Sequence, residues 1–290
     1  MIRYNPKIWF AQIFQVAKSD TLRILWKEMI LLAGISYGLC YVVETYLNDQ
    51  LSVLKDMVAL YSIIGFVLSL LLVFRTNTAY DRWWEGRKKW GELVNSSRNL
   101  ALKIQSFETS AASRSLFRRM IPNYAMAMKE HLRSGVKLDL LELEEAEADE
   151  IASLGHKPNY LAGKMFAQLQ EDTQSGKIGE MQFLSANNTL TTFTDILGAC
   201  ERIRNTPMPF SYNLFLKKFI FIYVITLPFA FFHNFGYYTI LISIFIFYVL
   251  VSIEILAEEI EDPFGEDDND LPTDDLSRKI RDNVREILKP

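Results

Sequence analysis

One uncharged segment and the charged stretch behind it constrain this chain most. Residues 57–74 carry no charge, and residues 75–90 are rich in Arg, Lys and Trp. Eighteen residues that each rise ~1.5 Å just cross a hydrocarbon core of ~30 Å. No Pro or Gly interrupts residues 66–85, so we expect one helix to continue from the membrane into water. Basic and aromatic side chains are common at the boundary between membrane and water. We therefore assign Arg82, Trp83 and Trp84 as an interface motif.

A shorter uncharged segment precedes this one. Residues 29–43 are few for a membrane span, but the segment becomes adequate if its helix extends through Glu28 and Glu44 to the interfaces. We therefore predict a first membrane helix here.

A third uncharged segment, residues 219–253, is nearly twice as long as one span requires. Pro228, His233 and Gly236 lie in its middle and are typical of a turn. We expect two spans there, at about 214–232 and 237–257, and four in all.

The distribution of Lys and Arg predicts the orientation. These residues are frequent before the first span, after the second and before the third, whereas the loop between the first two spans holds only Lys55. By the positive-inside rule, both termini and the large middle region are cytoplasmic. The expected fold class is an all-α membrane protein, divided into an N-terminal cytoplasmic segment (1–28), membrane helices 1 and 2 (29–74), a cytoplasmic helical domain (75–213), membrane helices 3 and 4 (214–257), and an acidic loop with a C-terminal tail (258–290).

The cytoplasmic part reads as helical. Helices are expected at 113–134, 162–174 and 178–203, and the acidic run 139–150 reads as a solvated face or as a vestibule that attracts cations. The tail has a stripe of apolar residues at four-residue steps, which requires a partner surface; its members are Leu276, Ile280, Val284 and Leu288.

No pattern typical of an enzyme is present. The three histidines, His131, His156 and His233, are scattered without metal-ligand spacing, and no phosphate-binding Gly-rich loop occurs. The net charge of −4 gives no bulk support for a nucleic-acid partner. Cys40 and Cys200 are too few for a disulfide framework. We expect neither catalytic residues nor a required cofactor.

Three ordered sequence blocks resemble the bestrophin family in its bacterial form. They are residues 74–87, which contain the interface motif, residues 200–212 before the third span, and residues 258–272 after the fourth. The resemblance implies a homopentameric ion channel in the bacterial inner membrane, with lipids and permeant monovalent ions as its other partners. Animal members conduct chloride and open with calcium, whereas cation permeation is associated with bacterial relatives. The sign of the permeant ion therefore stays open.

The resemblance also implies two constrictions. A hydrophobic neck is expected at Phe66, Leu70 and Phe74, and steps of four residues independently keep these side chains on one helical face. Five copies would form three apolar rings, which can close a pore by dewetting. A second constriction is expected at Met208, between two prolines at the cytoplasmic exit.

An acidic segment matches the calcium clasp of the animal members. The resemblance assigns Asp262, Glu266, Asp267 and Asp270 as a candidate clasp for Ca²⁺. Asn269 and Asp262 depart from the animal pattern, which has Asp and Asn at these positions, and a solvated acidic loop is the alternative.

Two other classes of protein compete with a passive channel. A secondary transporter usually has charged or broken helices at the midplane and inverted repeats, which this chain lacks apart from Pro228. A membrane scaffold or sensor would explain the large cytoplasmic part without any pore.

Overall fold

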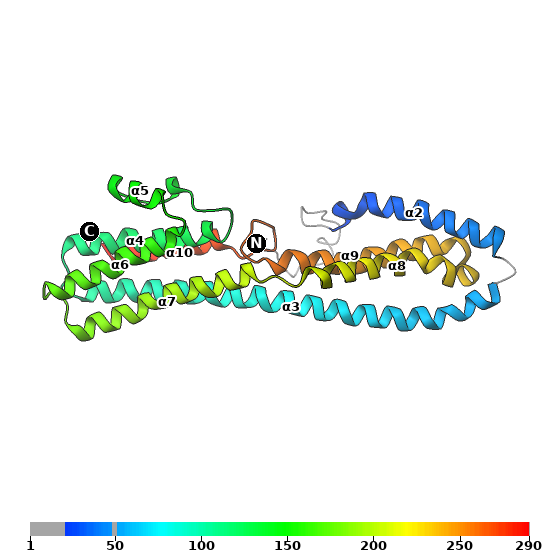
Figure 1. Ribbon diagram of the computed structural model, residues 1–290, viewed down its shortest axis with the longest axis horizontal. Helices are drawn as coiled ribbons and strands as arrows, with labels where there is room; N and C mark the ends of the chain where they lie inside the picture. Colours follow the sequence, from blue (N-terminus) through cyan, green and yellow to red (C-terminus); the bar gives the residue numbers. More distant parts are fainter. Residues whose placement is uncertain (1–20, 48–50, 290) are drawn as a thin grey trace. The chain divides into compact units, whose positions relative to one another are not determined.

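The computed structural model describes residues 21–47 and 51–289, which contain helices and no strand (Figure 1). The chain divides into two compact units. The first unit comprises the described residues up to Arg82, with Pro207–Glu261 and Asp267–Asn269. The second unit comprises Trp83–Thr206, Asp262–Glu266 and the described residues from Asp270 onward.

The long helix predicted from the opening sequence feature is present. Helix α3 runs from Leu51 to Ser106 without a break, which confirms that residues 66–85 continue one helix. In its apolar half, Ser69 Oγ donates to the carbonyl of Gly65 at 2.8 Å and Thr76 Oγ1 to that of Leu72 at 2.9 Å. These two hydroxyls are therefore satisfied by the backbone of their own helix.

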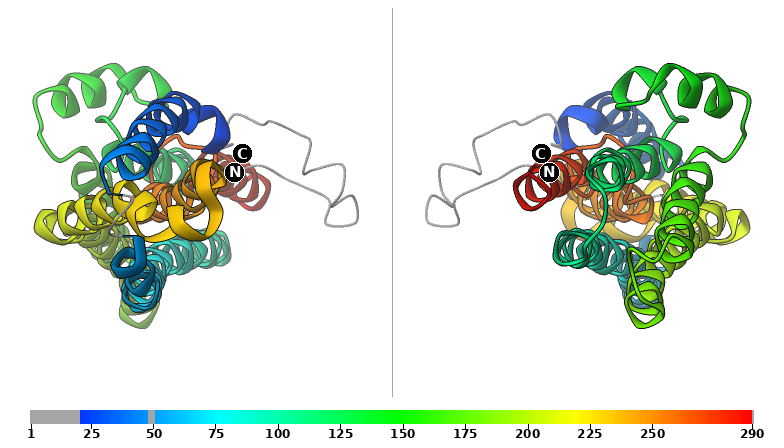
Figure 2. Two further views of the ribbon diagram at one scale, coloured as in Figure 1. Left: turned by 90° about the vertical axis from the view of Figure 1, so that its right-hand side faces the viewer. Right: turned by 90° about the vertical axis from the view of Figure 1, so that its left-hand side faces the viewer.

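Three further helices of the first unit pack on one another. They are α2 (Thr21–Tyr46), α8 (Phe210–Phe235) and α9 (Thr239–Glu261), and each contacts the other two (Figure 2). The short 3₁₀ turn η4 (Gly236–Tyr238) joins α8 to α9. Gly236 ends α8 with φ of +53°, a conformation that favours glycine. The predicted turn within residues 219–253 is therefore confirmed.

Helix α3 joins the first unit through buried leucines and one tyrosine. Leu68 and Leu72 lie in a common apolar core with Leu216 and Leu227 of α8. Tyr61 Oη donates to the carbonyl of Thr226 at 3.0 Å. This packing fixes which face of α3 is covered and leaves the other face exposed.

Three stretches of helix are long and apolar enough to cross a membrane, by length and composition, within the described residues. They are Thr21–Tyr46, Met57–Ser106 and Phe210–Glu261. The third stretch contains both α8 and α9, which lie against each other on either side of η4.

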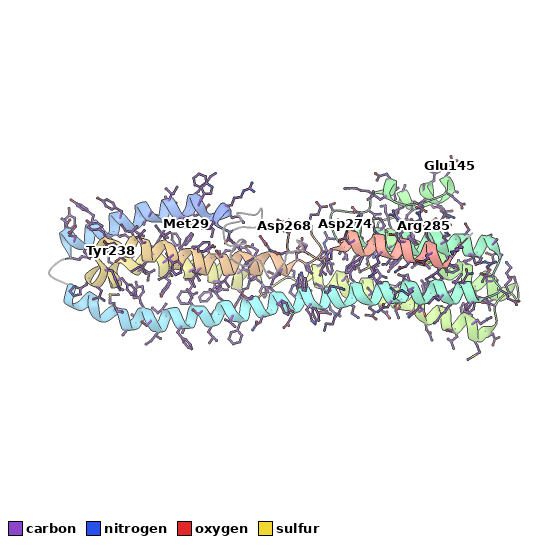
Figure 3. The ribbon with its side chains drawn as sticks, turned by 180° about the vertical axis from the view of Figure 1, so that it is seen from behind. Met29, Glu145, Tyr238, Asp268, Asp274 and Arg285 are labelled. Atoms are coloured by element: carbon purple, nitrogen blue, oxygen red, sulfur yellow. The ribbon has the colours of Figure 1, made fainter. Side chains whose placement is uncertain are left out.

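The second unit is also helical. The expected helices at 113–134, 162–174 and 178–203 correspond to α4 (Ala111–His131), α6 (Lys157–Gln174) and α7 (Glu180–Asn205). The acidic run holds η3 (Leu138–Leu140) and α5 (Glu145–Ala152), which is labelled at Glu145 in Figure 3. The core that these helices share with α3 includes Trp90, Leu100, Phe117, Tyr124 and Phe193.

The apolar stripe of the tail finds its partner within the same chain. Helix α10 (Thr273–Ile287), which carries the labels Asp274 and Arg285 in Figure 3, packs on α4. Ile280, Val284 and Leu288 are almost fully buried. The stripe therefore provides no surface for a second copy, and a pentamer has to be argued from other residues.

A cluster of charges fixes the start of α10. Asp274 accepts from Lys129 Nζ at 2.7 Å and from Arg133 Nη2 at 2.8 Å. Partial burial alone would raise the pKa of Asp274, but hydrogen bonds from Arg133 and Lys129 lower that pKa to about 2. The carboxylate also lies in the first turn of α10, where the helix dipole favours negative charge.

We expect Asp274→Asn to destabilise the protein at neutral pH. The side chain is 52% exposed, so solvent screening limits the loss to about 1 kcal/mol. Because folding depresses this pKa, the stabilisation is complete above the unfolded-state value and is lost as pH falls from about 4 to about 2. The difference in melting temperature between wild type and variant should shrink over that window.

Asp275→Asn is the matched control, since Asp275 lies in the same helical turn and pairs only with Arg278, which is 59% exposed, among the ion pairs of the described residues. That variant should change stability by less than about 0.5 kcal/mol at any of these pH values. Equal effects of the two variants would contradict a specific role for Asp274.

Candidate pore-lining and ion-binding residues

The three predicted neck residues lie on the exposed face of α3. The exposed fractions of Phe66, Leu70 and Phe74 are 70%, 44% and 57%. Four-residue steps place them on one side of the helix, away from the leucines that pack on α8. A single chain therefore leaves uncovered three large apolar side chains, which must meet lipid, a second copy or a pore.

Met208, which is partly buried, contacts the buried residues Arg75 and Glu261 of the first unit. Its sulfur accepts from Arg75 Nη1 at 3.0 Å, and its backbone N–H donates to Glu261 Oε1 at 2.5 Å. Arg75 Nη2 lies 2.6 Å from Glu261 Oε2, and Arg75 is 0% exposed. Within one chain the thioether therefore contacts Arg75, and its assignment to a constriction stays a prediction.

Sequence reasoning did not foresee the buried pair of Arg75 and Glu261. Arg75 was grouped with the other basic residues at the interface. One signal was available, because an Arg directly after eighteen uncharged residues requires a carboxylate if its helix is packed on that side. The partner could not be chosen from sequence, since the two residues are 186 positions apart.

The interface motif is divided between the units. Arg82 belongs to the first unit and donates through Nε to the carbonyl of Glu261 at 3.0 Å. Trp83 and Trp84 belong to the second unit, where their rings stack with centroids 6.5 Å apart. Trp83 packs against the core, whereas Trp84 is 46% exposed. Trp84 therefore exposes ring surface of the kind that is common where a helix meets the lipid headgroups.

The candidate calcium residues differ in their surroundings. Asp262, Glu266 and Asp267 are exposed, whereas Asp270 is 2% exposed. Glu266 Oε1 lies 3.8 Å from Arg133 Nη1, so a cationic side chain already faces this carboxylate. The oxygen-rich composition suits Ca²⁺, and at Glu266 the guanidinium of Arg133 competes with a cation for the carboxylate.

Two of the three histidines are brought together, which corrects the expectation that all three are scattered. His131 Nε2 and His156 Nε2 lie 2.7 Å and 2.9 Å from the same oxygen, Glu201 Oε1. The three residues come from α4, the start of α6 and α7, so their convergence depends on helix packing and not on sequence spacing. His233, in α8, is exposed.

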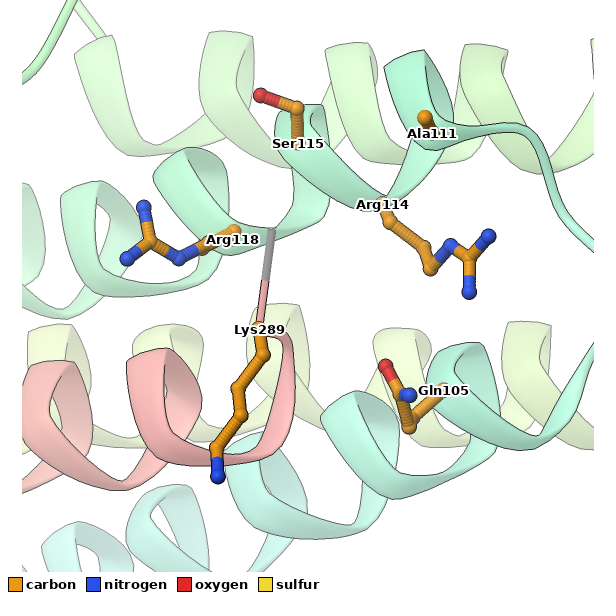
Figure 4. Close-up of a pocket in the computed structure, with 6 residues that line it drawn as sticks. All are labelled: Gln105, Ala111, Arg114, Ser115, Arg118 and Lys289. Atoms are coloured by element: carbon orange, nitrogen blue, oxygen red, sulfur yellow. The ribbon is translucent and has the colours of Figure 1, made fainter.

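A basic hollow lies between α4, the end of α3 and the residues after α10 (Figure 4). It has a volume of about 370 Å³, and its charged lining residues are Arg114, Arg118 and Lys289. No carboxylate is among the described residues that line it. Three cationic side chains that line one hollow give this surface a positive potential.

Comparison with known proteins places the chain in a family. The family model described as "Bacterial/Fungal Bestrophin protein" matches residues 1–286. A voltage-dependent anion channel-forming protein of Nostoc sp. is 35% identical, over 97% of this chain and 92% of that protein. One from Escherichia coli K12 is 33% identical, over 97% of this chain and 91% of its own length. The chain therefore belongs to the bestrophin family.

Solved structures agree with this assignment. The crystal structure of a bacterial bestrophin homologue from Klebsiella pneumoniae superposes with a TM-score of 0.84 at 27% identity. The match covers 92% of this chain and 100% of that one. With its apolar helices, the chain is a membrane protein of the bestrophin fold.

Proposed function

We propose that this chain forms an ion channel that passes small monovalent ions passively across a membrane. The observation that carries the proposal is the exposed apolar stripe of Phe66, Leu70 and Phe74 on the continuous helix α3. Bulky apolar rings gate by dewetting when several copies surround an axis. The relatives named as anion channel-forming proteins support the same activity.

The assembly that we propose is a homopentamer in the bacterial inner membrane, with both termini in the cytoplasm. Four membrane helices per subunit, α2, the apolar half of α3, α8 and α9, fit the three apolar stretches if the longest one crosses twice. Native mass spectrometry in detergent should give a mass five times 33.6 kDa. Monomers or dimers alone would contradict this assembly.

Ion flux from liposomes tests the activity. Purified protein in vesicles should dissipate a chloride or a sodium gradient with no second substrate and no applied coupling gradient, and the two gradients decide the sign of the ion. Flux that appears only with an opposing substrate gradient would favour a secondary transporter. A folded pentamer without flux under either gradient would favour a scaffold or sensor.

We also propose that the acidic loop binds Ca²⁺ through Asp267 and Asp270. A ligand that binds only the folded state raises the melting temperature by mass action. Melting temperature should rise with added calcium, and Asp267→Ala with Asp270→Ala should abolish that rise. Magnesium should substitute poorly, because it demands stricter octahedral geometry. An unchanged melting curve across calcium and chelator would leave the loop as a solvated surface.

A further inference from the structure

Two imidazoles and one carboxylate meet in the second unit, outside the predicted pore residues. The ligand atoms of His131, His156 and Glu201 all lie within 4.8 Å of one another. Both histidines direct Nε2 to Glu201 Oε1, at 2.7 Å and 2.9 Å, and their rings lie 4.6 Å apart. Among the described residues, this is the group of His, Cys, Asp and Glu side chains whose spacing could hold a metal ion.

Three separate elements hold these side chains in place. His131 is the last residue of α4, His156 caps the start of α6, and Glu201 lies in the last turns of α7. Arg204 of α7 donates to the carbonyls of His131 and Arg133, at 2.6 Å and 2.5 Å. Those two bonds tie the end of α4 to α7, so the backbones that carry His131 and Glu201 cannot easily separate.

Solvent can reach the group. The exposed fractions of the three side chains are 24%, 36% and 30%, for His131, His156 and Glu201. The donors in this group are two imidazole nitrogens and one carboxylate oxygen. The adjacent Cys200 is buried and is not a member of the group.

The distances suit a small divalent transition metal. Zinc takes imidazole nitrogen and carboxylate oxygen at about 2.0–2.2 Å in tetrahedral geometry, which separates ligand atoms by about 3.3 Å. The distances from the two histidine Nε2 atoms to Glu201 Oε1 are 2.7 Å and 2.9 Å, so each needs to widen by only about half an ångström to reach that value. Two His and one carboxylate leave a fourth position for water.

We propose that His131, His156 and Glu201 form a binding site for Zn²⁺ that links α4, α6 and α7. The ion replaces the two hydrogen bonds to Glu201 with three coordinate bonds. Metal at His156 Nε2 requires the ring proton to move to Nδ1, which now accepts the N–H of Asn159 at 3.3 Å. That long hydrogen bond is given up, and metal coordination more than offsets its loss.

Direct metal analysis of untagged protein tests this site. Protein in detergent is stripped of metal with EDTA, exchanged into buffer, incubated with ZnCl₂ and desalted. The zinc content per chain is then measured by inductively coupled plasma mass spectrometry. Wild type should retain one zinc per chain, and zinc should raise its melting temperature. Cobalt in place of zinc should give the visible absorption of a tetrahedral site.

The third histidine provides the matched control. His233→Gln removes an exposed histidine elsewhere and should leave binding unchanged. His131→Gln with His156→Gln should weaken binding by at least about 100-fold, since even the loss of an outer-shell partner costs 10–100-fold. Circular dichroism without metal checks that this variant folds, and His156→Asn alone is the milder alternative.

Two results would overturn the site. One is a wild-type protein that retains no zinc and gives no tetrahedral cobalt spectrum. The other is retention of zinc by a folded double variant, which would assign the ion to other ligands. Neither result bears on flux through the pore, so the proposed channel activity stands or falls separately.

Discussion

Replacing the neck residues with alanine should increase ion flux at least severalfold. Phe66→Ala, Leu70→Ala and Phe74→Ala together remove two aromatic rings and a leucine from the exposed face of α3. In a pore lined by five copies, smaller side chains widen the apolar constriction and make it easier for water to fill. Single-channel currents in planar bilayers measure the change directly.

The chain offers a control of the same composition. Phe221, Leu241 and Phe245 are exposed by 60%, 64% and 66%, and they lie on α8 and α9 instead of α3. Their replacement by alanine removes the same side chains from a surface that we assign to lipid. If both triple variants form the same oligomer and conduct alike, the neck is not at Phe66, Leu70 and Phe74.

Loss of the Glu261 carboxylate should destabilise the first unit by about 3 kcal/mol, because Arg75 would be left as an unpaired buried charge. Glu261→Gln keeps the size of the side chain and removes only its charge, which faces Arg75 at 2.6 Å. For a chain of this length, we expect the melting temperature to fall by roughly 5–10 °C. Tryptophan fluorescence during heating in detergent follows the change.

Two further variants separate the buried charge from general effects of α9. Glu258 lies one helical turn earlier and pairs with Lys217 at 2.9 Å, with exposed fractions of 56% and 48%. Glu258→Gln should cost less than about 1 kcal/mol, as exposed pairs do. Arg75→Met with Glu261→Met should recover most of the stability, because apolar replacement of both partners leaves no charge behind. Equal losses for Glu258→Gln and Glu261→Gln would refute a special role for the buried pair.

The helices could be predicted from the sequence because their signals are local. The absence of Pro and Gly from residues 66–85 predicted the continuity of α3, and Gly236 marked the turn between α8 and α9. The stripe of the tail predicted α10 for the same reason. Its partner, α4, is not encoded in that stripe and is identified only by the structure.

The proposed zinc ligands were harder to predict because they lie far apart in the sequence. His131 and Glu201 are 70 positions apart, and His156 and Glu201 are 45 apart. Metal motifs that can be recognised in sequence place their ligands within one helix or loop, which this group does not. The contact of Met208 with Arg75 was missed for the same reason. The neck residues came from a resemblance together with helical spacing, and their place in a pore stays a prediction.

The glycine at position 86 bears on how the acidic loop can respond to an ion. A Cβ atom there would lie 3.1 Å from the ring of Phe264 and 3.3 Å from Leu271, and both side chains are almost fully buried. The N–H of Leu271 also donates to the carbonyl of Pro263 at 2.9 Å. The two ends of the loop are thus already held together by apolar contacts with α3. Closing a loop has an entropic cost that grows with its length. Because packing at Gly86 already holds the loop ends together, that cost is met by folding of the chain. A cation that binds this loop would therefore bind more tightly than one that also had to order it.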